Sequence, residues 1–168
     1  IHDFSADVKA GQKIAIVGPT GAGKTTMVKL LMRFHDLKSG RIYLDGKDIT
    51  EFARGDLRKE FGMVLQDTWL YSGTIMENIR YGRLDATDEE VIQAAKAAQV
   101  DHFVRTLPDG YNTILNEEAT NVSQGQKQLL TIARAILSDS RIMILDEATS
   151  SVDTRTELSI QTAMDNLM

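Results

Sequence analysis

Residues 13–34 read KIAIVGPTGAGKTTMVKLLMRF, and this stretch decides the fold. Residues 13–17 form a short apolar run rich in β-branched side chains, which predicts a strand. After residue 24 the apolar side chains of Val28, Leu31 and Met32 recur at helical spacing. A glycine-rich loop lies between the two predicted elements. The order strand, loop, helix is the context that a phosphate-binding loop requires.

The loop itself, GPTGAGKT at residues 18–25, fits the pattern G-x-x-x-x-G-K-[ST]. Its glycines would let successive backbone N–H groups converge on phosphate oxygens, and the helix N-terminus adds the positive end of its dipole. These glycines are Gly18, Gly21 and Gly23. Lys24 would then bridge the β- and γ-phosphates of a nucleotide, and Thr25 would offer its hydroxyl to Mg²⁺. The alternative is a glycine-rich turn with a solvated lysine.

Three further stretches have strand character. Residues 41–44 (RIYL) alternate polar and apolar side chains before the turn signal Asp45-Gly46, which predicts a hairpin. Residues 62–65 (GMVL) predict another strand. Residues 141–145 (RIMIL) form an unbroken apolar run, typical of a parallel strand buried on both faces.

The pattern of apolar and polar residues changes between residues 74 and 122, where helical spacing predominates and no strongly β-rich run occurs. Thr87 or Asp88 can cap a helix running through EEVIQAAKAAQV. The predicted fold class is therefore α/β: a mainly parallel core sheet, a small antiparallel β region and an inserted α-helical subdomain. We expect one domain over residues 1–168, with residues 1–73 and 123–168 as its core.

Asp146 and Glu147 follow the predicted strand at residues 141–145 directly. That position is the C-terminal edge of the sheet, where open α/β folds bind ligands. Asp146 is suited to hold the Mg²⁺ shell through water, and Glu147 to polarise the water that attacks the γ-phosphate. A plain acidic turn that caps the next helix is the alternative, because residues 146–153 (DEATSSVD) also look like a loop entering a helix.

Composition narrows the classes of function. The chain has 168 residues, 42% of them hydrophobic, which is enough for one globular domain with a real core. Its net charge of −5 argues against electrostatic binding of nucleic acid. The absence of cysteine excludes disulfides and thiolate metal sites and fits a reducing compartment. No apolar run approaches the roughly 18 residues that span a bilayer.

On these motifs the chain resembles an ATP-binding cassette (ABC) domain of the exporter type, over nearly its whole length. Residues 18–25 are similar to the family's Walker A motif and residues 141–147 to its Walker B motif. VSQGQ at residues 122–126 resembles the signature motif, Gln66 in VLQD the Q-loop, and SSVD at residues 150–153 the D-loop. The run at residues 67–82 is similar to the segment of exporter cassettes that meets a membrane domain.

The resemblance implies ATP and Mg²⁺ as cofactors and a set of site residues. Nucleotide contacts are expected from Gly18, Pro19, Thr20, Gly21, Ala22, Gly23, Lys24, Thr25, Thr26, Gln66, Ser123, Gly125 and Gln126. Catalytic roles are expected for Glu147, Lys24 and Gln66, and metal binding for Thr25, Gln66 and Asp146. The activity implied is ATP hydrolysis coupled to transmembrane transport.

The signature stretch carries no catalytic side chain, and its sequence predicts a helix start instead. Ser123 and Gln126 fit a capping box ahead of an apolar face. That face consists of Leu129, Ile132, Ala133 and Ile136. In the family, two cassettes dimerise head to tail, so the resemblance implies that Ser123 and the Gly125 backbone act on nucleotide held by a second cassette. An ordinary capped helix is the plainer interpretation, and both can hold together.

Partners follow from the same resemblance: a second, identical or diverged cassette, and a transmembrane domain, which would hold the protein at the cytoplasmic face of the membrane. Trp69, Leu70 and Tyr71 would form part of the contact with that domain, or else belong to the core. Glu117 and Glu118 would belong to a loop near it, or to a solvated acidic turn. A non-transport ABC-type ATPase and a different P-loop enzyme, such as a small-molecule kinase, are the alternative functions.

The sequence departs from the family pattern in two ways. Val122 and Gln124 replace the leucine and the first glycine of the commoner Leu-Ser-Gly-Gly-Gln signature. The family's adenine-stacking aromatic and switch histidine have no counterpart here, since His2, His35 and His102 all precede the D-loop and Phe4 is expected to pack in a strand. The chain is therefore expected to be part of a longer cassette and, alone, to bind ATP weakly and hydrolyse it poorly.

Overall fold

The computed structural model describes residues 3–65, 68–116, 119–146 and 154–167 of the chain. These residues form two compact units, residues 1–59 and residues 60–168. Helices and strands mix in both, as an α/β protein requires. Three pairs of strands are described, two antiparallel and one parallel.

The N-terminal unit holds two helices, one 3₁₀ turn and a hairpin. Their bounds are α1 (Lys24–Leu31), β1 (Tyr43–Leu44), β2 (Lys47–Asp48), the 3₁₀ turn Ile49–Glu51 and α2 (Arg54–Lys59). The predicted hairpin is confirmed: β1 pairs antiparallel with β2, with Leu44 opposite Lys47. Asp45 and Gly46 between them have φ values of 50° and 80°. Two successive positive φ values are what a two-residue hairpin turn of type I′ needs.

The strand predicted at residues 13–17 is wrong for this structure. Residues 12–19 have no regular secondary structure, and Ile14, Ile16 and Val17 are exposed at 58%, 43% and 86%. Phe4, also expected in a strand, is 62% exposed. An apolar run of β-branched side chains fits well into a pleated, buried surface. A strand forms only where a neighbouring strand supplies hydrogen bonds, however. Residues 13–17 have no such partner within the described part of this unit.

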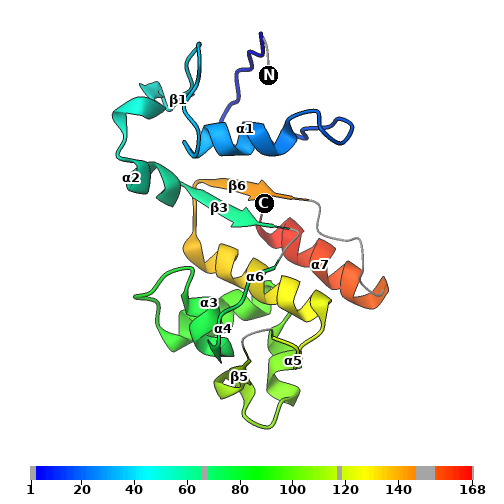
Figure 1. The fold of residues 1–168 in the computed structure, drawn as a ribbon. Coiled ribbons are helices and arrows are strands. Elements are labelled where there is room, and N and C mark those ends of the chain that lie inside the picture. Colours follow the sequence, from blue (N-terminus) through cyan, green and yellow to red (C-terminus); the bar gives the residue numbers. More distant parts are fainter. Residues whose placement is uncertain (1–2, 66–67, 117–118, 147–153, 168) are drawn as a thin grey trace. The chain divides into compact units, whose positions relative to one another are not determined.

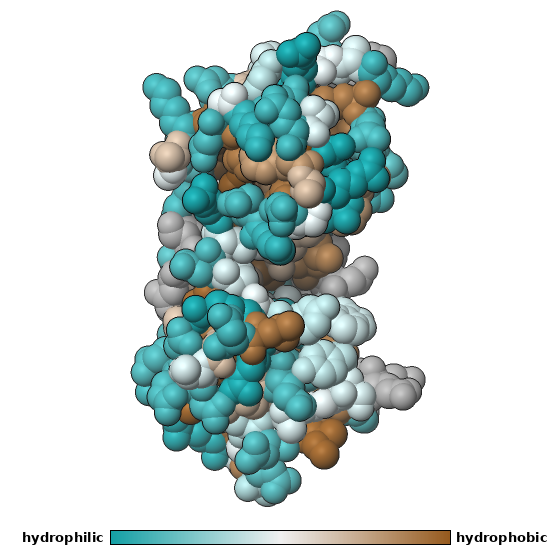
Figure 2. Space-filling model, turned by 90° about the vertical axis from the view of Figure 1, so that its left-hand side faces the viewer, coloured by the Kyte–Doolittle hydropathy of each residue, from teal (hydrophilic) through white to brown (hydrophobic). Residues whose placement is uncertain are grey.

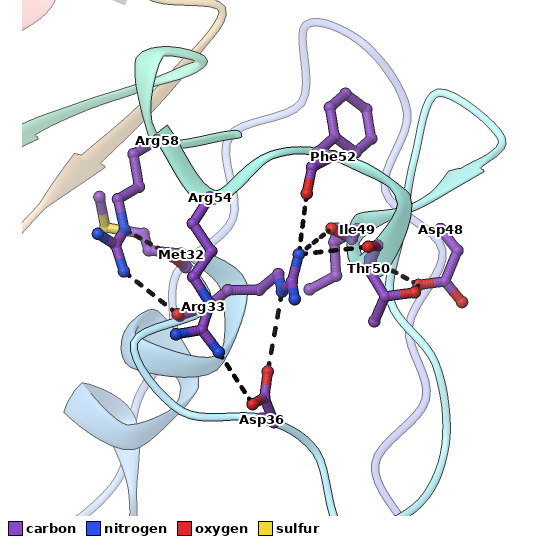
Figure 3. A network of polar contacts seen from close by, with 9 residues as sticks. All are labelled: Met32, Arg33, Asp36, Asp48, Ile49, Thr50, Phe52, Arg54 and Arg58. Atoms are coloured by element: carbon purple, nitrogen blue, oxygen red, sulfur yellow. Dashed lines mark hydrogen bonds and ion pairs between the residues drawn. The ribbon is translucent and has the colours of Figure 1, made fainter. Parts of the chain in front are cut away.

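The side chain of Arg33 links the segment after α1 to the segment before α2 through hydrogen bonds (Figure 3). Its Nη1 donates to the carbonyl oxygens of Ile49 at 3.1 Å, Thr50 at 3.4 Å and Phe52 at 3.0 Å. Its Nε lies 3.8 Å from Asp36 Oδ1, at ion-pair distance. Because the Arg33 side chain is only 15% exposed, these carbonyl groups have little access to water as a substitute partner.

We expect Arg33→Met to lower the free energy of unfolding by about 2 kcal/mol, because the Phe52 carbonyl group loses the donor of a partly buried hydrogen bond and the Ile49 carbonyl group keeps only the Phe52 N–H at 3.4 Å. Urea unfolding followed by circular dichroism measures this. The matched control is Arg54→Met, which removes the ion pair with Asp36 between side chains that are 54% and 64% exposed. An exposed pair contributes about 0.2–1 kcal/mol, so equal losses in the two variants would contradict the role given to Arg33.

The C-terminal unit is built around one long helix. Its elements are β3 (Phe61–Val64), β4 (Gly73–Thr74), α3 (Ile75–Arg80), α4 (Asp88–Ala97), α5 (Asp101–Thr106), the 3₁₀ turn Gly110–Asn112, β5 (Ile114–Leu115), α6 (Gln124–Ser138), β6 (Ile142–Leu145) and α7 (Thr154–Leu167). The helix α6 packs against β3, α3, α4 and α7 (Figure 1). Its apolar face is confirmed, with Leu129, Ile132 and Ala133 buried. Around it lie fully buried side chains from the surrounding elements, including Ile75, Ile79, Val91, Leu115 and Ile160.

β3 and β6 form the parallel pair, in register from Phe61 opposite Ile142 to Val64 opposite Leu145. Both strands were predicted from their apolar runs. All four residues of β6 are half-buried, however, whereas the unbroken run predicted a strand buried on both faces. In the described residues β6 is bonded to one neighbouring strand only, so less of its surface is covered.

Between β3 and α6 the chain is mainly helical, as predicted. Two of its helices begin with capping boxes: Thr74 pairs with Glu77 at α3, and Thr87 pairs with Glu90 at α4. The Thr74 N–H and hydroxyl donate to the Glu77 carboxylate and lower its pKa. One feature was not predicted, the short antiparallel pair of β4 and β5 with Gly73 opposite Leu115. A two-residue strand is too short to leave a periodic pattern in the sequence.

On the face shown in Figure 2, hydrophilic side chains predominate and hydrophobic ones show at separate places. None of the described helices combines the length and the apolar character needed to cross a membrane.

Candidate functional site

The phosphate-binding loop of the N-terminal unit opens directly into α1. Gly23 occupies the N-cap position with φ 94°, and no side chain caps this helix. Gly21 is also left-handed, with φ 84°. A residue with a Cβ would be strained at both positions. The first N–H groups of α1 are therefore not taken by a capping side chain, and together with the positive end of the helix dipole they are available to an anion.

The loop is tightly closed ahead of the helix. The Ala22 N–H donates to the Pro19 carbonyl oxygen at 3.1 Å, which makes a turn inside the loop. A Cβ added at Gly18 would lie 3.0 Å from the Ala22 Cβ, closer than side-chain carbons normally approach. Gly18 is thus needed for a close contact across the loop, and Gly21 and Gly23 for their backbone conformation.

Lys24 reaches back over the loop that precedes it. Its Nζ donates to the carbonyl oxygens of Gly18 at 2.6 Å and Pro19 at 3.2 Å. Neutral carbonyl oxygens are weaker partners for an ammonium group than phosphate oxygens are. An open depression of about 350 Å³ adjoins Lys24, and the other residues that line it are Asp3, Phe4, Ile16, Val17, Ala22, Gly23 and Met27. Thr25 and Thr26 follow on the first turn of α1 and are exposed.

The C-terminal unit holds the other predicted residues of the nucleotide site. Asp146 directly follows β6 and is exposed, and its N–H donates to the Val64 carbonyl oxygen at 2.9 Å. Gln66 is the second residue after β3 in the sequence, and Asp146 is the first after β6. Because β3 and β6 run parallel, they end at the same edge of the pair, and each is followed in the sequence by one of these two predicted metal-binding residues. Gln66 and Glu147 themselves lie outside the described residues, as do Glu117, Glu118 and the D-loop at residues 150–153.

The signature helix α6 has the start that the sequence predicts. Ser123 is its N-cap, and the Gln126 N–H donates to Ser123 Oγ at 3.2 Å. In return the Ser123 N–H donates to Gln126 Oε1 at 2.8 Å. This capping box uses the N–H groups of Ser123 and Gln126 and leaves those of Gln124 and Gly125 outside it. Ser123 is exposed but Gly125 is buried, so of the two residues expected to act on a second nucleotide only Ser123 is accessible to an anion.

Three contacts along α6 were not predicted. Gln124 Nε2 donates to Thr68 Oγ1 at 3.0 Å, and Arg134 donates to the Trp69 carbonyl oxygen at 3.1 Å. Asn78 is 1% exposed and shares hydrogen bonds with Arg134. A sequence gives no direct sign that residues more than fifty positions apart meet. A polar residue amid the apolar positions of α3 was the available signal for Asn78, because buried polar side chains are usually hydrogen-bonded.

A glycine-rich loop that opens a helix, together with a parallel strand that is directly followed by an aspartate, is typical of a P-loop nucleotide-binding domain. The family model described as ABC transporter matches residues 1–150, and the chain belongs to this family, whose ATP-binding domains are ATPases.

Its curated relatives include exporters. The chain is 60% identical over 167 residues to a fatty acid ABC transporter ATP-binding/permease protein of Mycobacterium tuberculosis, covering 99% of this chain and 26% of that protein. It is 48% identical to a β-(1→2)-glucan export ATP-binding/permease protein of Rhizobium johnstonii, covering 99% of this chain and 28% of that protein. The chain thus spans about a quarter of the length of these relatives.

Among solved structures, a bacterial Atm1-family ABC exporter with ATP bound matches with a TM-score of 0.86 and 46% identity. The match covers 94% of this chain and 28% of the exporter chain. The α/β fold of a P-loop ATPase, predicted from the sequence, is confirmed.

Proposed function

We propose that this chain is the ATP-hydrolysing motor domain of an ABC exporter. The observation that carries the proposal is the start of α1, where an uncapped helix N-terminus, two left-handed glycines and Lys24 surround one short loop. Those groups compensate the negative charge of a triphosphate, and phosphoryl transfer depends mainly on positioning and charge compensation. The relative named for glucan export and the matching ABC exporter structure with ATP bound support the same activity.

Each predicted site residue has a proposed role. Residues 18–26 hold the phosphates of ATP, with Lys24 on the β- and γ-phosphates. Thr25, Gln66 and Asp146 hold Mg²⁺, directly or through water; an exposed hydroxyl and an exposed carboxylate suit a cation that prefers oxygen ligands and keeps several waters. Mg²⁺ neutralises charge on the phosphates when bound. Glu147 orients the attacking water.

The partners are proposed from the relatives. Their ATP-binding/permease names support a membrane domain attached to this chain, with the chain at the cytoplasmic face of the membrane. We propose that residues 123–168, together with residues 1–73, form the core of the ATP-binding domain, and that residues 74–122 form its helical subdomain. A second copy, or a diverged subunit, would place the N-terminus of its α6 on the γ-phosphate held here, through the exposed Ser123 together with Gln126 and the backbone of the buried Gly125.

Sedimentation tests the arrangement in trans. A Glu147→Gln variant is expected to bind ATP without hydrolysing it, and therefore to sediment as a dimer with Mg-ATP and as a monomer with ADP. Adding Ser123→Arg should abolish the dimer, because a bulky cation then occupies the start of α6. Adding Ser39→Arg, at another exposed serine, should leave the dimer intact. A monomer under all conditions contradicts the head-to-tail dimer.

A further inference from the structure

The first turn of α6 divides its backbone donors into two pairs. The hydrogen bonds along the helix begin with the Lys127 N–H, which donates to the Ser123 carbonyl oxygen at 2.9 Å. Four N–H groups precede that bond, and the capping box takes those of Ser123 and Gln126. The N–H groups of Gln124 and Gly125 lie outside the box. Gln124 is exposed and Gly125 is buried, so Gln124 carries the more accessible backbone donor.

The side chain of Gln124 ties this turn to a distant part of the same unit. Its Nε2 donates to Thr68 Oγ1 at 3.0 Å, across 56 positions of the sequence. Thr68 lies between β3 and β4 and is half-buried. The capping box joins residues three positions apart, so it fixes the shape of the turn. The bond to Thr68 adds a contact that fixes where the turn lies against a segment outside α6.

The residue type at position 124 strengthens this effect. The commoner Leu-Ser-Gly-Gly-Gln signature has glycine where this chain has Gln124. Glycine offers no side chain to Thr68, and it loses more backbone freedom in a helix than glutamine does. Gln124 therefore orders the first turn both through its backbone and through its side-chain amide. Donors that are already ordered bind an anion with a smaller loss of freedom.

The bond between Gln124 and Thr68 adds little to the stability of the fold. Gln124 is exposed, so water can replace Thr68 as the partner of its amide. The helix is held elsewhere by its buried face, which includes Leu129, Ile132 and Ala133. The effect of the bond is therefore expected in the position of the first turn rather than in the folding of α6.

We infer that Gln124 is a positioning residue for the nucleotide held by a second copy of the chain. Its side-chain amide holds Thr68, and this contact keeps the Gln124 backbone N–H in the orientation that donates to the γ-phosphate. The inference rests on the proposed function, because it requires the start of α6 to meet the nucleotide of a second copy.

The first test measures how long ATP stays bound. The parent is the full-length transporter that carries this chain, with Glu147→Gln, in lipid nanodiscs. It is loaded with radiolabelled Mg-ATP and diluted into unlabelled ATP. Adding Gln124→Ala, which keeps a good helix former, should speed release about threefold to tenfold, as expected for the loss of one hydrogen bond. Release at the parent's rate overturns the inference.

The matched control is Gln161→Ala. Gln161 is an exposed glutamine on α7 whose amide donates to Asp165, four residues further along the same helix. Its removal deletes the same side-chain amide without touching α6. Release should stay within about twofold of the parent's rate, as for most surface substitutions. Equal acceleration in Gln161→Ala and Gln124→Ala overturns the inference.

Variants of Thr68 test the other side of the bond and cover the case in which Gln124→Ala does not fold. Thr68→Val removes the hydroxyl group and should match Gln124→Ala, whereas Thr68→Ser restores the hydroxyl and should return release to near the parent's rate. The double variant Thr68→Val with Gln124→Ala should release ATP no faster than either single variant, because both changes remove one bond. Accelerations that multiply in the double variant overturn the inference.

A comparison with ADP separates positioning from a general loosening of the helix. ADP has no γ-phosphate, so Gln124→Ala and Thr68→Val should leave the dissociation constant for ADP and the melting temperature without nucleotide at the parent's values. Equal weakening of ATP and ADP binding overturns the inference. A parent transporter that retains no ATP after dilution instead contradicts the proposed function.

Discussion

Replacing Lys24 by alanine is expected to lower kcat for ATP hydrolysis by about a hundredfold or more, the range found when one preorganised donor to a transition-state charge is removed. Lys24 is the cation of the phosphate loop, and its Nζ already lies over the loop on two carbonyl oxygens. In the proposed site the charge of the γ-phosphoryl group would develop within reach of this ammonium group, so we expect its loss to affect the chemical step more than the binding of the adenosine. Steady-state hydrolysis by the full-length transporter measures the effect.

Lys29→Ala is the matched control, because Lys29 lies on the same helix, is exposed and has no role in the proposed site. It should keep kcat within about twofold, as surface substitutions usually do. The outcome that contradicts the assignment is a Lys24→Ala variant with wild-type hydrolysis and an unchanged circular dichroism spectrum.

The local parts of the site follow from short-range sequence rules. The start of α1 follows from the glycine-rich motif, and the start of α6 from the spacing of Ser123 and Gln126. The caps of α4 and α6 were predicted and are confirmed, with side chains that bond within three residues of themselves. Each of these features depends on a few neighbouring residues, so the short sequence pattern is enough to predict where the helix begins and which side chain caps it.

What could not be predicted depends on distant partners. Residues 13–17 have the composition of a strand, yet a strand also needs a neighbour, and composition does not name one. The bonds from Arg134 to Asn78 and Trp69 join positions 56 and 65 residues apart. In the sequence of α6, Arg134 stands next to apolar positions and looks like an ordinary polar residue at the border of the apolar face. Only the packing of α3 against α6 reveals that Arg134 is one of the donors to the buried Asn78 side chain.

The close approach of α3 and α6 leads to the second large effect, at Gly82. A Cβ added to Gly82 would lie 2.1 Å from the Arg134 carbonyl oxygen and 3.1 Å from its carbonyl carbon. Both are backbone atoms of α6, which cannot rotate away. We expect Gly82→Ala to lower the free energy of unfolding by about 3 kcal/mol, at the upper end for overpacked positions, because a backbone segment must move. Urea unfolding of the chain, followed by circular dichroism, gives the value.

Gly73→Ala is the informative comparison in the same unit. Its Cβ would meet the Tyr71 ring at 2.7 Å and Glu77 Oε2 at 3.1 Å, which are side-chain atoms that can shift. We therefore expect a loss of about 1 kcal/mol, near the centre of measured substitutions. If Gly82→Ala were as mild as Gly73→Ala, α6 and the end of α3 would not be in backbone contact. The hydrogen bonds between Arg134 and Asn78, which cross this same contact, would then lose their rigid base.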